Sequence, residues 1–354
     1  YTDGVFQNPD GKAQFVNALY KGTADKTDAR HPLHLLTGRL RDQWHGMSRT
    51  GTVAQLFNHA EEPVIQMSAD DMMRRSIKNG DIVKVSNKRG SLVLAAQLSD
   101  EVQPSQTFIA MHWGSQFMHG LGVNALMPPT FDKTSKQPEL KHTAIKIEKL
   151  ALPWRMTVMR TIQNLDMIEK IRGLLANFDY ATCGLFGRQN QHHVGMLILR
   201  AAHTQAPDSA LIAQIDQILA MTDDMPLLNY QDAKRGISKR ILVNNASGKP
   251  EVTGVRLVGE TLATDWLKEM MTSGEFTAEL RRWALAPLGT PPTGQRSRGK
   301  IICNCLDVAE NDIIETIQLG ADLITLQNKL KCGTECGSCV PELKRLVTFH
   351  SKHS

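Results

Sequence analysis

The sequence predicts a multidomain fold with a strand-rich unit, a mixed α+β unit and a small helical unit, in that order. Residues 33–150 contain short alternating apolar runs, of which the clearest is a hairpin of two strands at 82–86 and 91–97. Residues 286–300 are rich in Pro, Gly and polar side chains, which is typical of a linker. Five of the six cysteines follow that linker, between Cys303 and Cys339. We therefore expect the chain to end in a compact unit whose chemistry depends on thiols.

The bulk composition is that of a globular protein. The chain has 354 residues, which suggests two or three domains, and 41% of them are hydrophobic and 22% charged. The formal net charge of +5 comes from dispersed Lys and Arg side chains, which argues against a nucleic-acid partner. No apolar run approaches the roughly 18 residues of a membrane helix, so we expect no membrane partner. The start at residues 1–4 resembles neither a signal peptide nor a natural beginning, and we expect residues 1–32 to lead in from an upstream catalytic domain.

Periodicity places the elements in order along the chain. In the strand-rich unit we expect strands at 32–36, 63–67, 82–86 and 91–97 and a short helix at 69–77. In the mixed unit, residues 151–285, we expect strands at 194–201 and 240–244 and helices at 209–221 and 264–271. In the last unit, residues 301–350, we expect helices at 311–319, at 322–330 after a cap at Asp322, and from about Pro341 onward.

The cysteines form two short motifs on loops at one end of these last helices. Cys303-Asn304-Cys305 follows the linker, and Cys336-Gly337-Ser338-Cys339 comes thirty residues later. Four thiolates can hold zinc or an iron–sulfur cluster, and the spacing alone leaves both open. Gly333 and Gly337 favour a cluster, because such a loop can turn its backbone N–H groups onto cluster sulfurs. Structural zinc and a disulfide staple remain alternatives, although such clustering favours metal and a reducing compartment.

The run Cys-Asn-Cys, then a helix pair, then Cys-Gly-Thr-Glu-Cys-Gly-Ser-Cys-Val-Pro-Glu-Leu resembles the bacterioferritin-associated-ferredoxin type of 2Fe–2S domain. The resemblance covers about residues 301–349 and implies a small all-α domain. Cys332 matches no ligand position, and we expect it to be packed near the cluster. The implied cluster ligands are Cys303, Cys305, Cys336 and Cys339.

A second site candidate lies where the first expected strand ends, at Thr37-Gly38-Arg39. Gly38 allows a close approach of the backbone, and Arg39 and Arg49 offer planar forks for phosphate. Thr50 adds a hydroxyl. This chemistry alone does not separate a phosphate site from an ordinary solvated loop, which is the commoner case.

The order of the motifs is more specific. Leu36-Thr37-Gly38-Arg39, Gln43-Trp44-His45, the hairpin from 77 to 85, Arg89-Gly90, His112-Trp113, and the segments 122–126 and 137–141 follow one another. As an ordered set they resemble the molydopterin-dinucleotide-binding domain of the dimethyl-sulfoxide-reductase superfamily over about residues 33–148. The resemblance implies a double-psi β-barrel that closes over a molybdenum bis(molybdopterin guanine dinucleotide) cofactor. The implied cofactor contacts are Thr37, Gly38, Arg39, His45, Thr50, His112, Trp113 and Asn124.

Several other sequence features give less information about function. Residues 120–125 fit the G-x-G-x-x-A dinucleotide pattern, but Pro128-Pro129 forbids the helix that must follow, so we reject a Rossmann interpretation. We expect His192-His193 to lie on an exposed turn and Cys183 to be a small buried residue. Residues 228–285 resemble, in patches, the small C-terminal domain of flavin-dependent nitrite and rubredoxin reductases. No catalytic constellation is evident in 151–285, and we expect a spacer or docking domain.

The three units together resemble the C-terminal portion of bacterial assimilatory nitrate reductases, within the molybdopterin oxidoreductases. The resemblance implies reduction of nitrate to nitrite in the cytoplasm, with electrons from a flavoprotein reductase, ferredoxin or flavodoxin. It places the catalytic residues, the molybdenum ligand and a 4Fe–4S cluster upstream of this chain. Alternatives are another molybdopterin oxidoreductase, such as a formate dehydrogenase or other oxyanion reductase, and a non-catalytic electron-transfer module.

Overall fold

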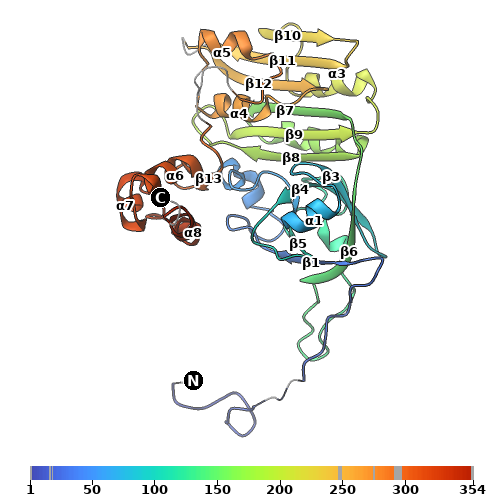
Figure 1. The fold of residues 1–354 in the computed structure, drawn as a ribbon, viewed down its shortest axis with the longest axis vertical. Coiled ribbons are helices and arrows are strands. Elements are labelled where there is room, and N and C mark those ends of the chain that lie inside the picture. Colours follow the sequence, from blue (N-terminus) through green and yellow to red (C-terminus); the bar gives the residue numbers. More distant parts are fainter. Residues whose placement is uncertain are drawn as a thin grey trace.

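The structure is a computed structural model that describes residues 2–15, 17, 19–245, 249–273, 276–290 and 297–351. The predicted linker at 286–300 therefore lies partly outside the described residues. Figure 1 shows a barrel in the middle, a broad sheet packed against it, and a small helical unit beside the barrel. An extended lead-in runs away from the barrel alongside the 127–141 loop, where the amide of Ala24 donates to Glu139 at 2.9 Å.

Six strands close into a barrel, in the order β1-β5-β2-β4-β3-β6. The pairs β1·β5 and β2·β4 are parallel and the other pairs are antiparallel. The closed barrel and four of its strands were predicted, whereas β5 and β6 were missed. A helix, α1 (Ala69–Arg74), begins where the Ser68 hydroxyl accepts from the amide of Asp71. The strands are β1 Leu33–Gly38, β2 Val64–Met67, β3 Ile82–Ser86, β4 Ser91–Leu98, β5 Gln106–Ala110 and β6 His142–Lys149.

Three short 3-10 helices lie in the barrel's long connections: η1 (Thr50–Thr52), η2 (Ala54–Phe57) and η3 (Val123–Leu126). The last of these occupies the segment that fits the dinucleotide pattern. Its four residues are followed by extended backbone at Met127. The long helix of a Rossmann motif is therefore absent here, as predicted.

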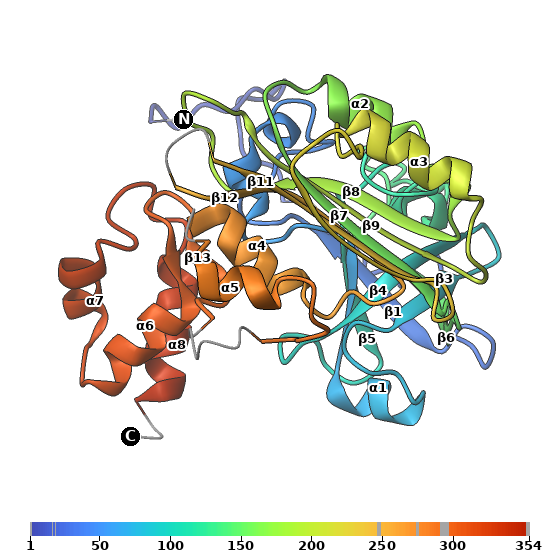
Figure 2. The ribbon, with the colours of Figure 1, turned by 90° about the horizontal axis from the view of Figure 1, so that it is seen from above.

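The middle of the chain forms a six-stranded antiparallel sheet, in the order β10-β11-β12-β7-β9-β8. Its strands are β7 Trp154–Ile162, β8 Tyr180–Phe186, β9 Gly195–His203, β10 Leu227–Asp232, β11 Ile237–Asn244 and β12 Glu251–Val258. Helices α2 (Asp166–Arg172) and α3 (Ser209–Ile218) cover one face, and α4 (Thr264–Ser273) and α5 (Ala278–Trp283) cover the other (Figure 2). Alternation divides β7 between the two faces: Val158 joins the core under α2 and α3, and Met159 the core under α4.

The sheet and the barrel are joined by the edge strand β8. The amide of Cys183 donates to Phe117 at 2.8 Å, and the amide of His119 donates to Ala181 at 2.9 Å. One hydrophobic core consequently runs from barrel residues such as Leu33 into the sheet. Cys183 is 1% exposed, which confirms the expected small buried residue, and His192 is exposed in a bend.

The small unit has its own core, built around Ile302, Ile313, Leu326 and Leu343. Its helices are α6 Glu310–Gln318, α7 Leu323–Leu330 and α8 Val340–His350, close to the predicted ranges. The Asp322 carboxylate accepts from the amide of Thr325 at 2.8 Å and so caps α7 as predicted. A two-stranded sheet of β13 (Ile301–Cys303) and β14 (Val308–Ala309) was not predicted. None of the helices in the described part of the chain combines the length and the apolar character needed to cross a bilayer.

Candidate functional site

The four predicted ligand cysteines meet at one end of the small unit. Cys303 ends β13 and Cys305 lies in the turn that follows, while Cys339 is the N-cap residue of α8. The Sγ atoms of Cys305 and Cys336 are 3.1 Å apart, and Cys303 and Cys339 form a second contacting pair. The structure thus brings together two motifs that are about thirty residues apart in the sequence.

This donor set fits a two-iron cluster. A 2Fe–2S cluster takes two protein thiolates on each iron, which matches two sulfur pairs, whereas a zinc ion collects its four ligands around one point. Within the described residues, no three His, Cys, Asp or Glu side chains lie close enough together to hold a single metal ion. The two contacting sulfur pairs, Cys305 with Cys336 and Cys303 with Cys339, are compatible with one pair on each iron of such a cluster.

The two sulfur pairs differ in exposure. Cys303 and Cys339 are each 2% exposed, whereas Cys336 is exposed to solvent. Burial, more than the neighbouring thiol of Cys303, raises the pKa of Cys339 to about 12. The hydroxyl and amide of Ser338 lower the pKa of Cys336. A cation is therefore needed to hold Cys339 as a thiolate, which is what a bound metal supplies.

Cys332 is a packing residue. It is 0% exposed, it belongs to the core of the small unit, and burial raises its pKa to about 11. Gly333 follows with φ +80°, and a Cβ there would lie 2.9 Å from the side chain of Val340. The bend after Cys332 therefore requires glycine, and it directs the chain towards Cys336.

The loop that carries Cys303 and Cys305 is held from outside the small unit. Arg41 donates to the carbonyl of Ile302 at 2.9 Å, and the side chain of Gln55 donates to the carbonyl of Asn304. Arg188, just beyond β8, donates to the carbonyls of Asn304 and Cys305 at 2.9 and 3.0 Å. Asn304 is only 7% exposed as a result. The small unit is docked on the barrel and the sheet through its cysteine loop.

A partly buried carboxylate on α8 completes this docking. Glu342 accepts from Arg41 at 2.8 Å, from His59 at 3.1 Å and from Lys300 at 3.0 Å. Burial alone would raise its pKa, but the hydrogen bond from His59 and the charge of Lys300 outweigh burial and lower it to about 2. Glu342 is therefore ionised at neutral pH and joins the barrel connection to the small unit.

On the barrel, a cavity of about 380 Å³ opens beside the end of β5 and the helix η3. It is lined by His112, Trp113 and Asn124, three of the predicted cofactor contacts, together with Gly46 and Ser48 from the loop after β1. The structure thus places the loop after β1 and the two later motifs around one cavity.

His112 holds these loops together. Its Nε2 accepts from the amide of Leu40 at 2.9 Å, so Nδ1 carries the proton and donates to the carbonyl of His45 at 2.6 Å. Burial lowers its pKa, which keeps the ring neutral. Both ring nitrogens are used within the chain, and the residue therefore acts as a clamp between loops.

The other predicted cofactor contacts differ in how exposed their side chains are. Arg39 is exposed and stacks over Trp44, with 4.4 Å between its guanidinium carbon and the ring centroid, and His45 and Asn124 are also exposed. The hydroxyl of Thr37 donates to the carbonyl of Leu140, and that of Thr50 accepts from the amide of Trp44. The side chain of Phe108 would lie 3.0 Å from a Cβ at Gly38, and Trp113 is buried beside Phe57 and Phe117 at 3% exposure.

Sequence reasoning missed the importance of Gly122 for this cavity. Its φ is +78°, and a Cβ would lie 2.4 Å from the carbonyl oxygen of Trp113. The segment 122–126 was included in the ordered motif set, but only Asn124 within it was predicted to contact the cofactor.

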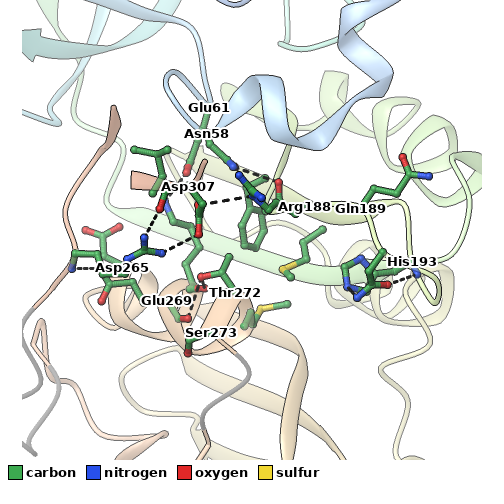
Figure 3. Close-up of a pocket in the computed structure, with 18 of the residues that line it drawn as sticks. Asn58, Glu61, Arg188, Gln189, His193, Asp265, Glu269, Thr272, Ser273 and Asp307 are labelled. Carbon is green, nitrogen blue, oxygen red and sulfur yellow. Dashed lines mark hydrogen bonds and ion pairs between the residues drawn. The ribbon is translucent and has the colours of Figure 1, made fainter. Parts of the chain in front are cut away.

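A second cavity, of about 470 Å³, lies where barrel, sheet and small unit meet (Figure 3). Its charged lining is largely paired internally: Lys268 with Glu61, Arg298 with Asp307 at 3.1 Å, and Arg188 with Asp307 at 4.0 Å. Sequence reasoning did not anticipate this junction, because its residues come from segments far apart in the chain.

Comparison with known families identifies two of the units. Residues 33–144 match the molydopterin dinucleotide binding domain, and residues 301–348 match the BFD-like [2Fe-2S] binding domain. The chain therefore combines a pterin-dinucleotide-binding barrel with a 2Fe–2S-binding domain, as the motifs predicted.

The relatives that match this chain include nitrate reductases and a formate dehydrogenase subunit. A nitrate reductase from Klebsiella oxytoca is 29% identical over 96% of this chain, which spans 36% of that protein. A nitrate reductase from Symbiobacterium thermophilum is 31% identical over 41% of the chain and 19% of the relative. The F420-dependent formate dehydrogenase subunit alpha of Methanocaldococcus jannaschii is 29% identical over 41% of the chain and 21% of the relative. The chain thus covers only about a third or less of the length of these curated relatives.

Among solved structures, acetylene hydratase from Pelobacter acetylenicus aligns with 34% of this chain and 18% of its own, at 15% identity and a TM-score of 0.29. That score is too low to support an argument.

Proposed function

We propose that this chain is part of a molybdenum-dependent assimilatory nitrate reductase, to which it supplies the pterin-dinucleotide lid and a 2Fe–2S domain for electron entry. The observation that carries the proposal is the docking of the cysteine loop, through Arg41 and Gln55, on the barrel connection that follows β1. A redox centre fixed to a pterin-binding barrel is suited to passing electrons towards the molybdenum site.

In this proposal Cys303, Cys305, Cys336 and Cys339 bind the 2Fe–2S cluster. Their pairing and their graded exposure support this assignment. The exposed Cys336 marks the side where a donor protein approaches, and we propose a flavoprotein reductase, ferredoxin or flavodoxin. The cytoplasm suits the cysteines, because its reducing environment keeps them available for metal.

On the barrel, the exposed donors Arg39, His45 and Asn124 would bind and orient the pterin dinucleotide. Arg39 offers the planar fork that suits a pyrophosphate, and His112 would hold the surrounding loops in place. Thr37, Gly38, Thr50 and Trp113 would shape the backbone around the cofactor. When bound, the molybdenum centre supplies the oxygen-atom transfer, and the protein supplies orientation and electrostatics.

Nitrate is favoured over formate as the substrate because the nitrate reductase relative matches more of this chain. The Klebsiella nitrate reductase matches over 96% of the chain, which includes all three units, whereas the formate dehydrogenase subunit matches over 41%. In the full-length enzyme we expect molybdenum and reduction of nitrate to nitrite with a one-electron donor. Formate oxidation without nitrate reduction would overturn the substrate assignment, and absence of molybdenum would favour an electron-transfer module.

The direct test of the cluster is chemical analysis of the anaerobically purified chain. We expect two irons and two acid-labile sulfides per chain, with a 2Fe–2S paramagnetic resonance signal after reduction. Zinc without sulfide would mean that the four cysteines hold a structural metal ion, and the small unit would then have no role in electron entry. In the full-length enzyme, Cys336→Ser should abolish donor-linked turnover while Cys332→Ser should not. Intact turnover in Cys336→Ser would contradict the relay.

A further inference from the structure

Three donors outside the small unit engage three carbonyls of the cysteine loop. Arg41 and Gln55 come from the connection after β1, and Arg188 follows β8. Their acceptors are the carbonyls of Ile302, Asn304 and Cys305. The conformation of the loop is therefore determined jointly by the barrel, the sheet and the small unit.

These contacts orient the peptide groups of the loop. In a trans peptide the carbonyl and the N–H point in opposite directions. Carbonyls that accept from the barrel and sheet consequently turn the N–H groups of Cys303, Cys305 and Leu306 away from those donors. Backbone N–H groups directed at cluster sulfurs favour the more negatively charged, reduced state of an iron–sulfur cluster.

The same contacts bring positive charge to the site. Arg188 spans two carbonyls with one nitrogen and faces Asp307, with 4.0 Å between its Nε and the carboxylate (Figure 3). Arg41 is held by Asp42 at 3.0 Å, and Asp42 in turn accepts from the side-chain amide of Asn304 at 3.0 Å. Four thiolates around two irons carry excess negative charge, which nearby guanidinium groups stabilise. The carboxylates of Asp307, Asp42 and Glu342 offset part of the charge of these two arginines.

We propose that Arg188 and Arg41 are positioning residues for the 2Fe–2S centre, and that they set its reduction potential and its retention of iron from outside the domain that binds it. The inference rests on the proposed 2Fe–2S cluster. Neither arginine ligates the metal, and both act through the backbone of the cysteine loop.

The test compares Arg188→Gln, Arg188→Lys and the control Arg235→Gln in the intact chain, each checked for folding by circular dichroism. Arg235 is exposed on the turn between β10 and β11 and pairs only weakly with Asp232, at 3.8 Å. The readouts are the reduced-cluster signal at a fixed ambient potential and the rate of iron release to a chelator.

We expect Arg188→Gln to lower the ratio of reduced to oxidised cluster about tenfold, which for one electron is about 59 mV. Iron release should become severalfold faster. Arg188→Lys keeps the charge but lacks the guanidinium nitrogen that contacts both carbonyls, so its reduced ratio should fall less while iron release stays fast. The control should match the wild type in both readouts.

Unchanged reduced ratio and unchanged iron release in both Arg188 variants and in Arg41→Gln would overturn the inference and leave the proposed function standing. A wild-type chain without iron and sulfide would overturn both. Should Arg188→Gln fail to fold, Arg188→Lys and Arg41→Gln decide the question, because each removes only part of the loop's support.

Discussion

The Glu342→Gln substitution tests how firmly the small unit is fixed to the barrel. In the folded chain, hydrogen bonding from His59 and the charge of Lys300 overcome burial and lower the pKa of Glu342 from 4.5 to about 2. That difference corresponds to about 3 kcal/mol at neutral pH. Part of it comes from Lys300, which directly precedes β13 of the small unit, so on the order of a hundredfold is an upper bound for the docking equilibrium. Because the folded pKa lies below the unfolded value, this stability is present above about pH 4.5 and is lost as the pH falls towards 2.

Amide hydrogen exchange over residues 301–306 and 41–59 measures the docking directly. At pH 7 we expect Glu342→Gln to exchange up to about a hundredfold faster in both segments. The matched control is Glu335→Gln, a glutamate that is exposed on the loop before Cys336. After correction for intrinsic rates, protection in the wild type should fall between pH 4.5 and 2, and that fall should be absent in Glu342→Gln. Equal protection of variant and wild type at pH 7 would refute the view that this carboxylate fixes the unit.

Three further predictions concern single residues. Gly122→Ala should lower the free energy of unfolding by about 2 kcal/mol or more, because φ is +78° and a Cβ would meet the Trp113 carbonyl; Gly114→Ala, where the space is open, should change the denaturation midpoint little. Cys332→Ala should keep two irons per chain by metal analysis, at a cost of about 1 kcal/mol in stability. Burial lowers the pKa of His112 below 6.5, so the stability that its neutral ring contributes is full above pH 6.5 and declines as the pH falls below that value. Between pH 7 and pH 5, the free energy of unfolding should therefore fall more in the wild type than in His112→Gln, as measured by denaturation.

The small unit was predictable because its signals are local. The cap at Asp322, the apolar spacing of α6 and the proline at the start of α8 each act within one or two turns of helix. The paired cysteines are two short motifs whose separation the helices fix. No long-range contact was needed to expect that these motifs meet.

The barrel was harder, because its pairing is not local. β5 is five residues long and pairs in parallel with β1, some seventy residues earlier, so nothing in its own sequence separates it from a loop. His112 was expected to touch the cofactor, since a motif gives the position of a residue but not its partners. Its use of both nitrogens to clamp Leu40 and His45 becomes visible only once the loops are folded together.

Arg188 could not be predicted from the sequence, although it contacts the cysteine loop directly. Its acceptors lie 116 and 117 positions further along the chain, so no local pattern could identify it. Arg188 and Arg41 hold the Cys303–Cys305 loop against the barrel and sheet. Cys303 is buried on this loop and Cys305 is partly buried, while Cys336 stays exposed on the loop before α8. In the proposed relay, the donor approaches on the side of Cys336 and the acceptor lies beyond the docked loop. Because the docked loop lies on the acceptor side of that relay, weakening the dock should slow electron transfer out of the cluster more than electron transfer into it.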